Sequence, residues 1–173
     1  MMRFVRKKRA LFMDVDNTLI VTRSGNKFPI DNMDWRFKEG MLRALLSFFR
    51  KNSKFSYLLL VSNQGGISMG FVKEEDIIEK FESIVDKLRK ILPKRIRVDY
   101  KYCPNMKGIN RKPKPGMAFE FRDEIGISLP NSIMVGDADG SEESFSDSDR
   151  VFAKNALMYK FYNPQEFIKS FTK

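Results

Sequence analysis

The chain has 173 residues, of which 42% are hydrophobic and 31% are charged, a balance typical of a globular protein that buries its core within one domain, residues 1–173. Lysine and arginine (32) exceed aspartate and glutamate (22), and the resulting net charge of +10 favours polyanionic partners such as nucleic acid. No run of residues is apolar enough to span a membrane, and one cysteine, Cys103, excludes an internal disulfide.

The first nine residues form a basic N-terminal arm with arginine or lysine at positions 3 and 6–9. The apolar segment that follows is interrupted by Asp14, which argues against an export signal. The single thiol also fits a reducing compartment. We therefore expect an intracellular protein, in the cytoplasm or, in a eukaryotic host, the nucleus.

Residues 10–13 are expected to form a short buried strand, and it leads into Asp14-Val15-Asp16-Asn17-Thr18. The period of two along an extended chain would aim Asp14 and Asp16 the same way. Two carboxylates that lie close together at the end of one strand repel each other. The pattern therefore indicates either a metal ion or separate acid and base roles.

The next elements alternate between helix and strand. We expect a helix over residues 40–51, with Leu42, Leu45, Leu46 and Phe49 on one side, and a strand over residues 55–61 that ends at Ser62-Asn63. A long helix over residues 74–92 should bury six apolar residues and stop at Pro93. These six are Ile77, Ile78, Phe81, Ile84, Val85 and Leu88.

The second half continues the alternation. A strand over residues 96–102 precedes a basic, proline-rich loop that holds Lys112, and a helix then runs through Phe121 to Gly126. A strand over residues 132–135 enters Gly136-Asp137, and a strand near residues 157–161 precedes a final helix from about residue 164. This order predicts a Rossmann-like, doubly wound α/β fold, a parallel sheet with helices on both faces and its ligand site beyond the carboxyl ends of the strands.

That rule brings the polar residues at the strand ends and in the basic loop to one site suited to phosphoryl transfer. Asp14 would attack phosphorus, and Asp16 would protonate the leaving oxygen and then activate water. Ser62 would hold phosphate oxygens and Lys112 would offset charge, with Thr18 and Asn63 in the same site. Oxygen ligands from Asp14, Asp16 and Asp137 favour Mg²⁺ over zinc.

Four segments resemble the motifs of the haloacid dehalogenase (HAD) superfamily of phosphatases. They are Asp14-Val15-Asp16-Asn17-Thr18, then Ser62, then Lys112 within Arg111-Lys112-Pro113, and Gly136-Asp137. Lys114 competes with Lys112 for the third motif. The segments after the first and second motifs are too short for a large cap domain, so we expect an open site.

Within that superfamily the chain resembles the phosphatase domain of polynucleotide kinase 3′-phosphatase along nearly its whole length. The likeness is carried by Thr22-Arg23-Ser24-Gly25, Asp34-Trp35-Arg36, Gly136-Asp137-Ala138, Ser148-Asp149-Arg150 and Pro164-Gln165-Glu166-Phe167. It implies Mg²⁺-dependent removal of 3′-phosphates from DNA or RNA ends through an aspartyl-phosphate. No Gly-x-x-x-x-Gly-Lys-Ser/Thr segment is present, which predicts no kinase activity and leaves room for a separate kinase or ligase.

The pattern departs from that family at a few positions. Asn17 stands where the family usually has glycine. The segment from Gly136 to Asp149 is shortened, which leaves the roles of Asp139 and Asp149 open. For Asp149 we favour capping of the following helix.

Two other functions compete with this one. A small-molecule phosphatase of the histidinol-phosphate or heptose-bisphosphate type shares the segment from Arg111 to Met117, although Cys103 alone cannot form the zinc loop that many of those enzymes carry. A non-catalytic nucleic-acid-binding HAD protein is the second alternative.

Several side chains are candidates for holding the substrate. Backbone-phosphate contacts are assigned to Arg23, Lys27, Arg111, Lys114 and Arg150. Among the aromatic residues that could stack on bases, Tyr57 is expected in the core. Trp35 could lie either in the core or beside the site, where it would stack on a base.

Overall fold

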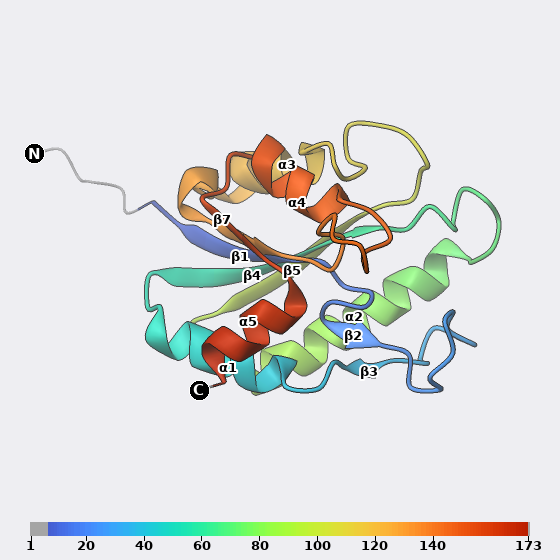
Figure 1. Cartoon of the computed structure of the whole chain (residues 1–173), viewed down its shortest axis with the longest axis horizontal. Coiled ribbons are helices and arrows are strands. Elements are labelled where there is room, and N and C mark those ends of the chain that lie inside the picture. The colour runs from blue at the N-terminus through green and yellow to red at the C-terminus, as the bar shows by residue number, and fades with distance from the viewer. Residues whose placement is uncertain (1–6, 173) are drawn as a thin grey trace, which may run out of the picture.

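A parallel five-stranded sheet forms the centre of the computed structural model, which describes residues 7–172 (Figure 1). Residues 1–6 of the basic arm lie outside the described residues. The strand order is β5-β4-β1-β6-β7, and every neighbouring pair is parallel. The strands are β1 (Arg9–Met13), β4 (Phe55–Asn63), β5 (Arg97–Cys103), β6 (Ile133–Val135) and β7 (Lys160–Tyr162).

Helices cover both faces of this sheet, which confirms the predicted α/β class. Helices α1 (Met41–Lys51), α2 (Glu74–Ile91) and α5 (Pro164–Phe171) lie on one face, and α3 (Gly116–Ile125) and α4 (Ser148–Asn155) lie on the other (Figure 1). A 3₁₀ turn, η1 (Leu129–Asn131), precedes β6. None of the helices within residues 7–172 is both long enough and apolar enough to cross a membrane.

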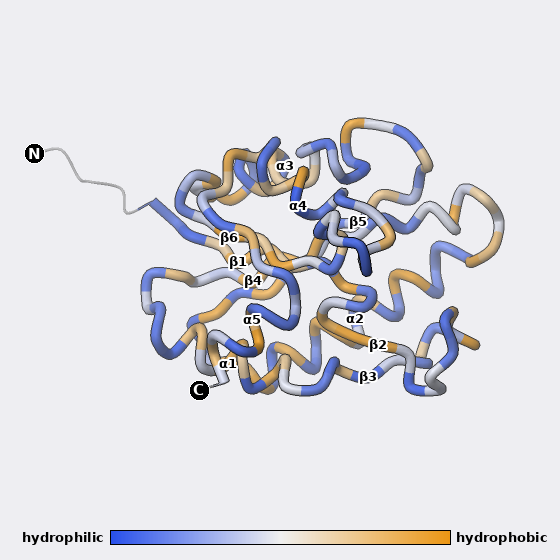
Figure 2. The backbone as a smooth tube through the Cα atoms, viewed as in Figure 1, coloured by the Kyte–Doolittle hydropathy of each residue, from blue (hydrophilic) through white to orange (hydrophobic). Residues whose placement is uncertain are grey.

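The period of two along each strand produces two apolar cores. Leu11 and Met13 of β1 face the α1–α2–α5 side, whereas Ala10 and Phe12 face the α3–α4 side. All four are fully buried. Strands that are buried on both faces consist of nearly continuous apolar residues. Figure 2 shows this, because the central strands are coloured mainly as hydrophobic.

A two-stranded antiparallel sheet, β2 (Ile20–Val21) with β3 (Arg36–Phe37), lies between β1 and α1 and was not predicted. It places Trp35 in the core, 3% exposed and edge-on to Phe37 at a centroid distance of 5.4 Å. Tyr57 is also buried, as expected. The insertion is short, so no large cap domain covers the strand ends within the described residues.

The buried faces of two helices differ in part from the prediction. Leu46 in α1 and Ile78 in α2 are 39% and 40% exposed. In α1 the inward face is rotated toward Phe48, whose ring contacts Phe55 and Phe171 at centroid distances of 5.0 and 5.1 Å. Aromatic packing from distant segments therefore fixes the rotation of α1 about its axis.

The last strand is shorter than expected. Leu157 and Tyr159 are 72% and 60% exposed, and Leu157 has a positive φ of 56°, so the extended chain begins only at Lys160. Helix α5 then starts with a capping box between Asn163 and Glu166.

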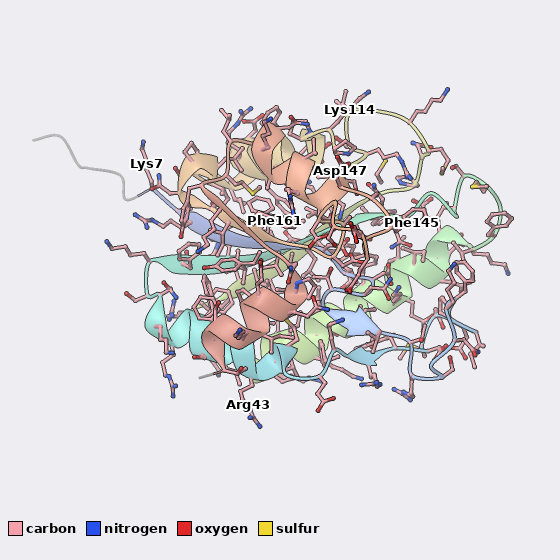
Figure 3. The ribbon with its side chains drawn as sticks, viewed as in Figure 1. Lys7, Arg43, Lys114, Phe145, Asp147 and Phe161 are labelled. Atoms are coloured by element: carbon pink, nitrogen blue, oxygen red, sulfur yellow. The ribbon has the colours of Figure 1, made fainter. Side chains whose placement is uncertain are left out.

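The two ends of the sheet differ in what surrounds them. All five strands begin at the end where Lys7 lies and finish toward the end where the long loops carry Lys114 and Phe145 (Figure 3). The predicted catalytic residues follow the carboxyl ends of β1, β4 and β6.

Candidate active site

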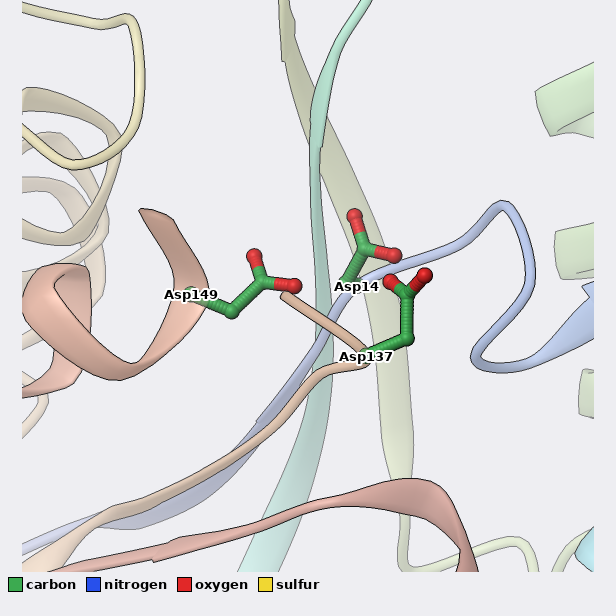
Figure 4. Close-up of side chains that lie close together, drawn as sticks. All are labelled: Asp14, Asp137 and Asp149. Atoms are coloured by element: carbon green, nitrogen blue, oxygen red, sulfur yellow. The ribbon is translucent and has the colours of Figure 1, made fainter. Parts of the chain in front are cut away.

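Three carboxylates meet beyond the carboxyl ends of the central strands. Asp14 follows β1, Asp137 follows β6, and Asp149 comes from the first turn of α4 (Figure 4). One oxygen of each lies within 4.8 Å of the others. Asp14 and Asp149 are buried, and Asp137 is partly exposed. We call these three residues the acidic cluster.

Lys112 is the cation of this cluster. Its ammonium lies 2.6 Å from a carboxylate oxygen of Asp14 and 2.7 Å from one of Asp149, and it donates to the Val61 carbonyl at 2.9 Å. The Lys112 side chain is only 2% exposed, whereas Lys114 points to solvent. The structure therefore places Lys112, and not Lys114, at the position of the third motif.

Asn63 holds the loop that delivers Lys112. Its amide nitrogen donates to the Lys112 carbonyl at 3.0 Å, and its amide oxygen accepts from the Lys112 backbone N–H at 2.9 Å. Asn63 is the last residue of β4, so this pair of hydrogen bonds fastens the basic loop directly to the sheet.

The preference for Asp149 as a helix cap is wrong. The residue before α4 is Asp147, and no side chain caps that helix. Asp149 instead accepts from the Ala138 backbone N–H at 3.1 Å and pairs with Lys112. It packs so tightly on Gly136 that a Cβ built there would lie 2.4 Å from an Asp149 oxygen. Gly136 is therefore required by close approach.

Asp16 does not point the same way as Asp14. One carboxylate oxygen lies 2.6 Å from the Lys80 ammonium, and the other accepts from Gln64 at 2.8 Å. The extended period ends at β1, because the chain turns through Asn17 (φ 62°) and the Leu19 N–H bonds back to Val15. Asp16 therefore does not belong to the described acidic cluster, and its predicted role as a metal ligand stays a prediction.

Lys80 and Gln64 are not among the site residues predicted from the sequence. Lys80 is 6% exposed and lies on the face of α2 that also buries Ile77 and Ile84. A lysine within an apolar stripe at helical spacing was the available signal. Gln64 also donates to the Ser62 hydroxyl at 2.8 Å and so joins the second motif to Asp16.

Thr18 fixes the loop that carries Asp137. Its hydroxyl donates to an Asp137 carboxylate oxygen at 3.2 Å and accepts from the Asp137 backbone N–H at 3.0 Å. Thr18 and Ser62 are both buried, with exposures of 0% and 2%. The first, second and fourth motifs thus meet at one sheet edge, as predicted.

Burial and mutual repulsion of its carboxylates give the acidic cluster an affinity for a cation. Burial raises the pKa of Asp14 well above its usual range, and although Lys112 lowers it, Asp149 and Asp137 raise it further. Burial and the neighbouring Asp149 also raise the pKa of Asp137. Burial alone would lower the pKa of Lys112, but Asp14 and Asp149 outweigh it and raise that pKa, so Lys112 stays charged.

The donor set of the cluster fits a hard divalent cation. Its ligand atoms are carboxylate oxygens, without histidine or thiolate among the described residues of the group. One ammonium cannot balance three carboxylates, so a further positive charge would relieve their repulsion. Asp139 lies outside the cluster, because it accepts from Ser141 and Asn163, and the hydrogen bonds from Ser141 lower its pKa.

The residues assigned to substrate binding are scattered around the loops. Arg23 donates to the Trp35 carbonyl at 3.4 Å, and Arg111 donates to the Asn105 carbonyl at 3.1 Å. Lys27 lies 5.6 Å from the centroid of the Phe28 ring, and Arg150 lies 5.9 Å from that of Phe161. Among the contacts of the described residues, none joins these cations or Lys114 to the acidic cluster. Their role in substrate binding stays a prediction.

Known proteins similar to the chain include phosphatases that act on two kinds of substrate. A family model described as polynucleotide kinase 3 phosphatase matches residues 9–168. The bifunctional polynucleotide phosphatase/kinase of Schizosaccharomyces pombe is 31% identical over 94% of this chain and 38% of its own length. The D-glycero-alpha-D-manno-heptose-1,7-bisphosphate 7-phosphatase of Campylobacter jejuni is 34% identical over 76% of this chain and 72% of its own.

A protein without an assigned function and two solved structures extend the likeness. An uncharacterized 20.8 kDa protein of Autographa californica nuclear polyhedrosis virus is 36% identical over 95% of this chain and 87% of its own length. A HAD-like phosphatase from Mesorhizobium loti shares the fold, with a TM-score of 0.69, 20% identity and coverage of 96% and 87%. The D,D-heptose 1,7-bisphosphate phosphatase of B. bronchiseptica, solved with magnesium and phosphate, gives a TM-score of 0.66, 19% identity and coverage of 88% and 78%.

Gly136→Ala is expected to displace Asp149 and, through it, Lys112. The new Cβ would lie 2.4–2.5 Å from Asp149 atoms, and overpacking of this kind costs roughly 1–3 kcal/mol of unfolding free energy. Urea denaturation and phosphatase assays should both show a loss. Gly66→Ala is the control, because its Cβ would meet Val72 at an ordinary 3.4 Å. Full activity in Gly136→Ala would show that close packing of Asp149 on Gly136 is not needed for the site.

Asp14→Asn is expected to raise the melting temperature of the protein in EDTA at pH 7. The pKa of Asp14 is raised in the folded state, so its ionised form opposes folding at neutral pH, and the difference between variant and parent should shrink as pH falls toward 3.8. Scanning calorimetry measures this. Asp139→Asn is the control of opposite sign, because hydrogen bonds lower the Asp139 pKa. A lower melting temperature for Asp14→Asn would show that the pKa of Asp14 is not raised in the folded state.

Proposed function

The chain belongs to the polynucleotide kinase 3 phosphatase family of HAD-like phosphatases, and from this premise we propose that it removes 3′-phosphates from the ends of DNA or RNA. The observation that carries the proposal is the match of the family model to residues 9–168, which contain the whole acidic cluster, Lys112 and the Asp16–Lys80 pair. The described residues include no large cap domain over the strand ends, which supports a polymer end as substrate.

Mg²⁺ is the proposed cofactor, with Asp14 and Asp137 as ligands and Asp149 beside them. When bound, the ion would supply positive charge that offsets the repulsion between a phosphate group and these carboxylates. The heptose-bisphosphate phosphatase of similar fold was solved with magnesium and phosphate, which is consistent with this choice.

The chain's own residues then divide the reaction into two steps. A carboxylate oxygen of Asp14 attacks phosphorus, the bond from phosphorus to the 3′-oxygen breaks, and Asp16 gives its proton to that oxygen. Water next attacks the aspartyl-phosphate while Asp16 takes its proton, which releases phosphate and restores Asp14. Lys112 and the Ser62 hydroxyl stabilise the charged phosphoryl oxygens.

A second candidate is a heptose-bisphosphate phosphatase, favoured by the 34% identity to the Campylobacter jejuni enzyme. That relative matches 76% of this chain, whereas the Schizosaccharomyces pombe polynucleotide enzyme matches 94%. The wider match favours the polymer substrate. Because the chain lacks a phosphate-binding loop of the Gly-x-x-x-x-Gly-Lys type, the proposed activity does not include phosphorylation of 5′ ends.

The direct test is phosphate release from a 3′-phosphorylated oligonucleotide with Mg²⁺, alongside D-glycero-D-manno-heptose 1,7-bisphosphate and histidinol phosphate. We expect turnover of the oligonucleotide, with at least a roughly hundredfold loss in Asp14→Asn because the nucleophile is gone, and a loss in EDTA. Turnover of the small substrates alone would replace the proposal with the metabolite phosphatase. Tight oligonucleotide binding without any turnover would indicate a non-catalytic binding protein.

Lys80→Met is expected to lower kcat roughly 10- to 100-fold with little change in KM, because the general acid–base Asp16 loses the ammonium that orients it. Steady-state kinetics on the best substrate separates the two constants, and Lys80→Arg should recover part of the loss. Lys87→Met, at another exposed position of the same helix, is the control. Equal kcat in Lys80→Met and Lys87→Met would show that the ion pair does not serve catalysis.

A further inference from the structure

The excess positive charge of the chain gathers at the end of the sheet opposite the active site. All five strands are parallel, so the segments that lead into them lie together at this end. Lysines and arginines occupy the start of β1, the ends of α1 and α2, and the turns before β4 and β5. They are Lys7, Lys8, Arg9, Arg50, Lys51, Lys54, Arg89, Lys90, Lys94, Arg95 and Arg97, and we call them the amino-end face.

The mouth of the active site has a different charge pattern. Helix α2 begins there with three acidic residues, Glu74, Glu75 and Asp76, and the loop after β6 carries Glu142, Glu143 and Asp147. These carboxylates offset the cations of the neighbouring loops. The net charge of +10 therefore reflects the amino-end face more than the catalytic mouth.

A cavity of about 600 Å³ lies within the amino-end face, at the start of β5. Arg89, Lys94 and Arg97 line it, against one lining carboxylate, Asp99, and Tyr57 and Val98 supply apolar surface. This is room for one or two phosphate groups with their sugars.

Lys8 extends the positive charge to the rim of this cavity. Its ammonium donates to the carbonyl of Ile125, a lining residue, at 2.8 Å, and lies 5.9 Å from the centroid of the Tyr57 ring. Four cations thus surround one concave surface, and they come from the segment before β1, from α2, from the turn before β5 and from the first residue of β5.

Two of these cations are available to a ligand. Lys94 and Arg97 are exposed, and neither takes part in an ion pair within residues 7–172. Arg95 has a structural role instead, because its guanidinium donates to the carbonyls of Phe49 and Phe55. Arg89 donates to the Val98 carbonyl at 3.1 Å, which holds its side chain against the cavity wall.

The middle of β5 separates this cavity from the active site. Lys101 there is paired with Glu120 at 3.2 Å and with Glu124 at 2.7 Å, and the Tyr100 and Tyr102 hydroxyls donate to Glu82 and Glu74. The neighbouring β4 spans nine residues, or about 30 Å at roughly 3.3 Å per residue. The cavity is therefore a separate site and not an extension of the mouth.

We infer that the amino-end cavity binds the phosphodiester backbone of a nucleic acid, at a second contact remote from the 3′ end that is hydrolysed. The choice of nucleic acid as the polyanion rests on the proposed function. Free lysine and arginine side chains spread over one face suit an extended series of phosphates better than a single anion. Such a contact would hold the polymer near the enzyme and raise the local concentration of its ends.

Charge reversal of the two free cations tests this inference. Lys94→Glu/Arg97→Glu is compared with Arg43→Glu/Lys169→Glu, which makes the same change in net charge at exposed positions of α1 and α5. The probe is a fluorescent 30-nucleotide single strand with a 3′-hydroxyl, so that binding is measured without turnover. Fluorescence anisotropy across a salt series gives Kd and its salt dependence.

We expect Lys94→Glu/Arg97→Glu to weaken binding at least about tenfold at low salt and to reduce the slope of log K against log salt by about 1.5, as loss of two phosphate contacts predicts. The control should bind like the parent. Turnover of p-nitrophenyl phosphate should be unchanged in both variants, because the cavity is remote from Asp14. If it falls in the cavity variant, Lys94→Gln/Arg97→Gln replaces it in the same comparison.

Unchanged affinity in the cavity variant, or an equal loss in the control, would overturn the inference and leave the cavity to another partner, such as an acidic protein. The proposed function is judged separately, by hydrolysis of a 3′-phosphorylated oligonucleotide. A protein that binds the 30-mer through Lys94 and Arg97 but does not hydrolyse that substrate would refute the proposed function while it supports this site.

Discussion

The ammonium of Lys112 is the interaction on which the site depends. Asp14 and Asp149 are buried a few ångströms apart, and two buried carboxylates this close repel each other unless a cation lies between them. Lys112 contacts both, and Asn63 fastens its loop to β4 by two backbone hydrogen bonds. The first, third and fourth motifs can therefore share a buried edge only because the basic loop is fixed to the sheet.

The parts of this arrangement that follow from local rules could be predicted from the sequence. Apolar runs bounded by polar residues identified the central strands, and the rule that ligands bind at the carboxyl ends of parallel strands brought Asp14, Asp137 and Lys112 together. The predicted bounds of α1 and α2, the end of α3 and the start of α5 agree with the structure to within a residue or two, since caps and breakers such as Pro93 and Gly126 are local signals.

The parts that arise from tertiary packing could not be predicted in this way. Asp149 at the start of α4 matches the pattern of a cap, and only its close approach to Gly136 shows that it belongs to the acidic cluster. Asp16 separates from Asp14 because the chain turns at Asn17, and its partner Lys80 comes from a helix 64 residues away. In each case the deciding contact joins segments that the sequence alone does not place side by side.

The different distribution of charge at the two ends of the sheet reflects two demands that one surface could not meet. A site that concentrates carboxylates to hold a cation repels the phosphates of its substrate, and adding many lysines beside it would neutralise those carboxylates. A parallel sheet solves this conflict because it separates the two ends of every strand, by about 30 Å along β4 at roughly 3.3 Å per residue. The carboxyl ends can then hold Asp14, Asp137 and Asp149, while the segments before β4 and β5 carry exposed cations. The same topology that assembles the acidic cluster thus leaves the amino-end face free for positive charge.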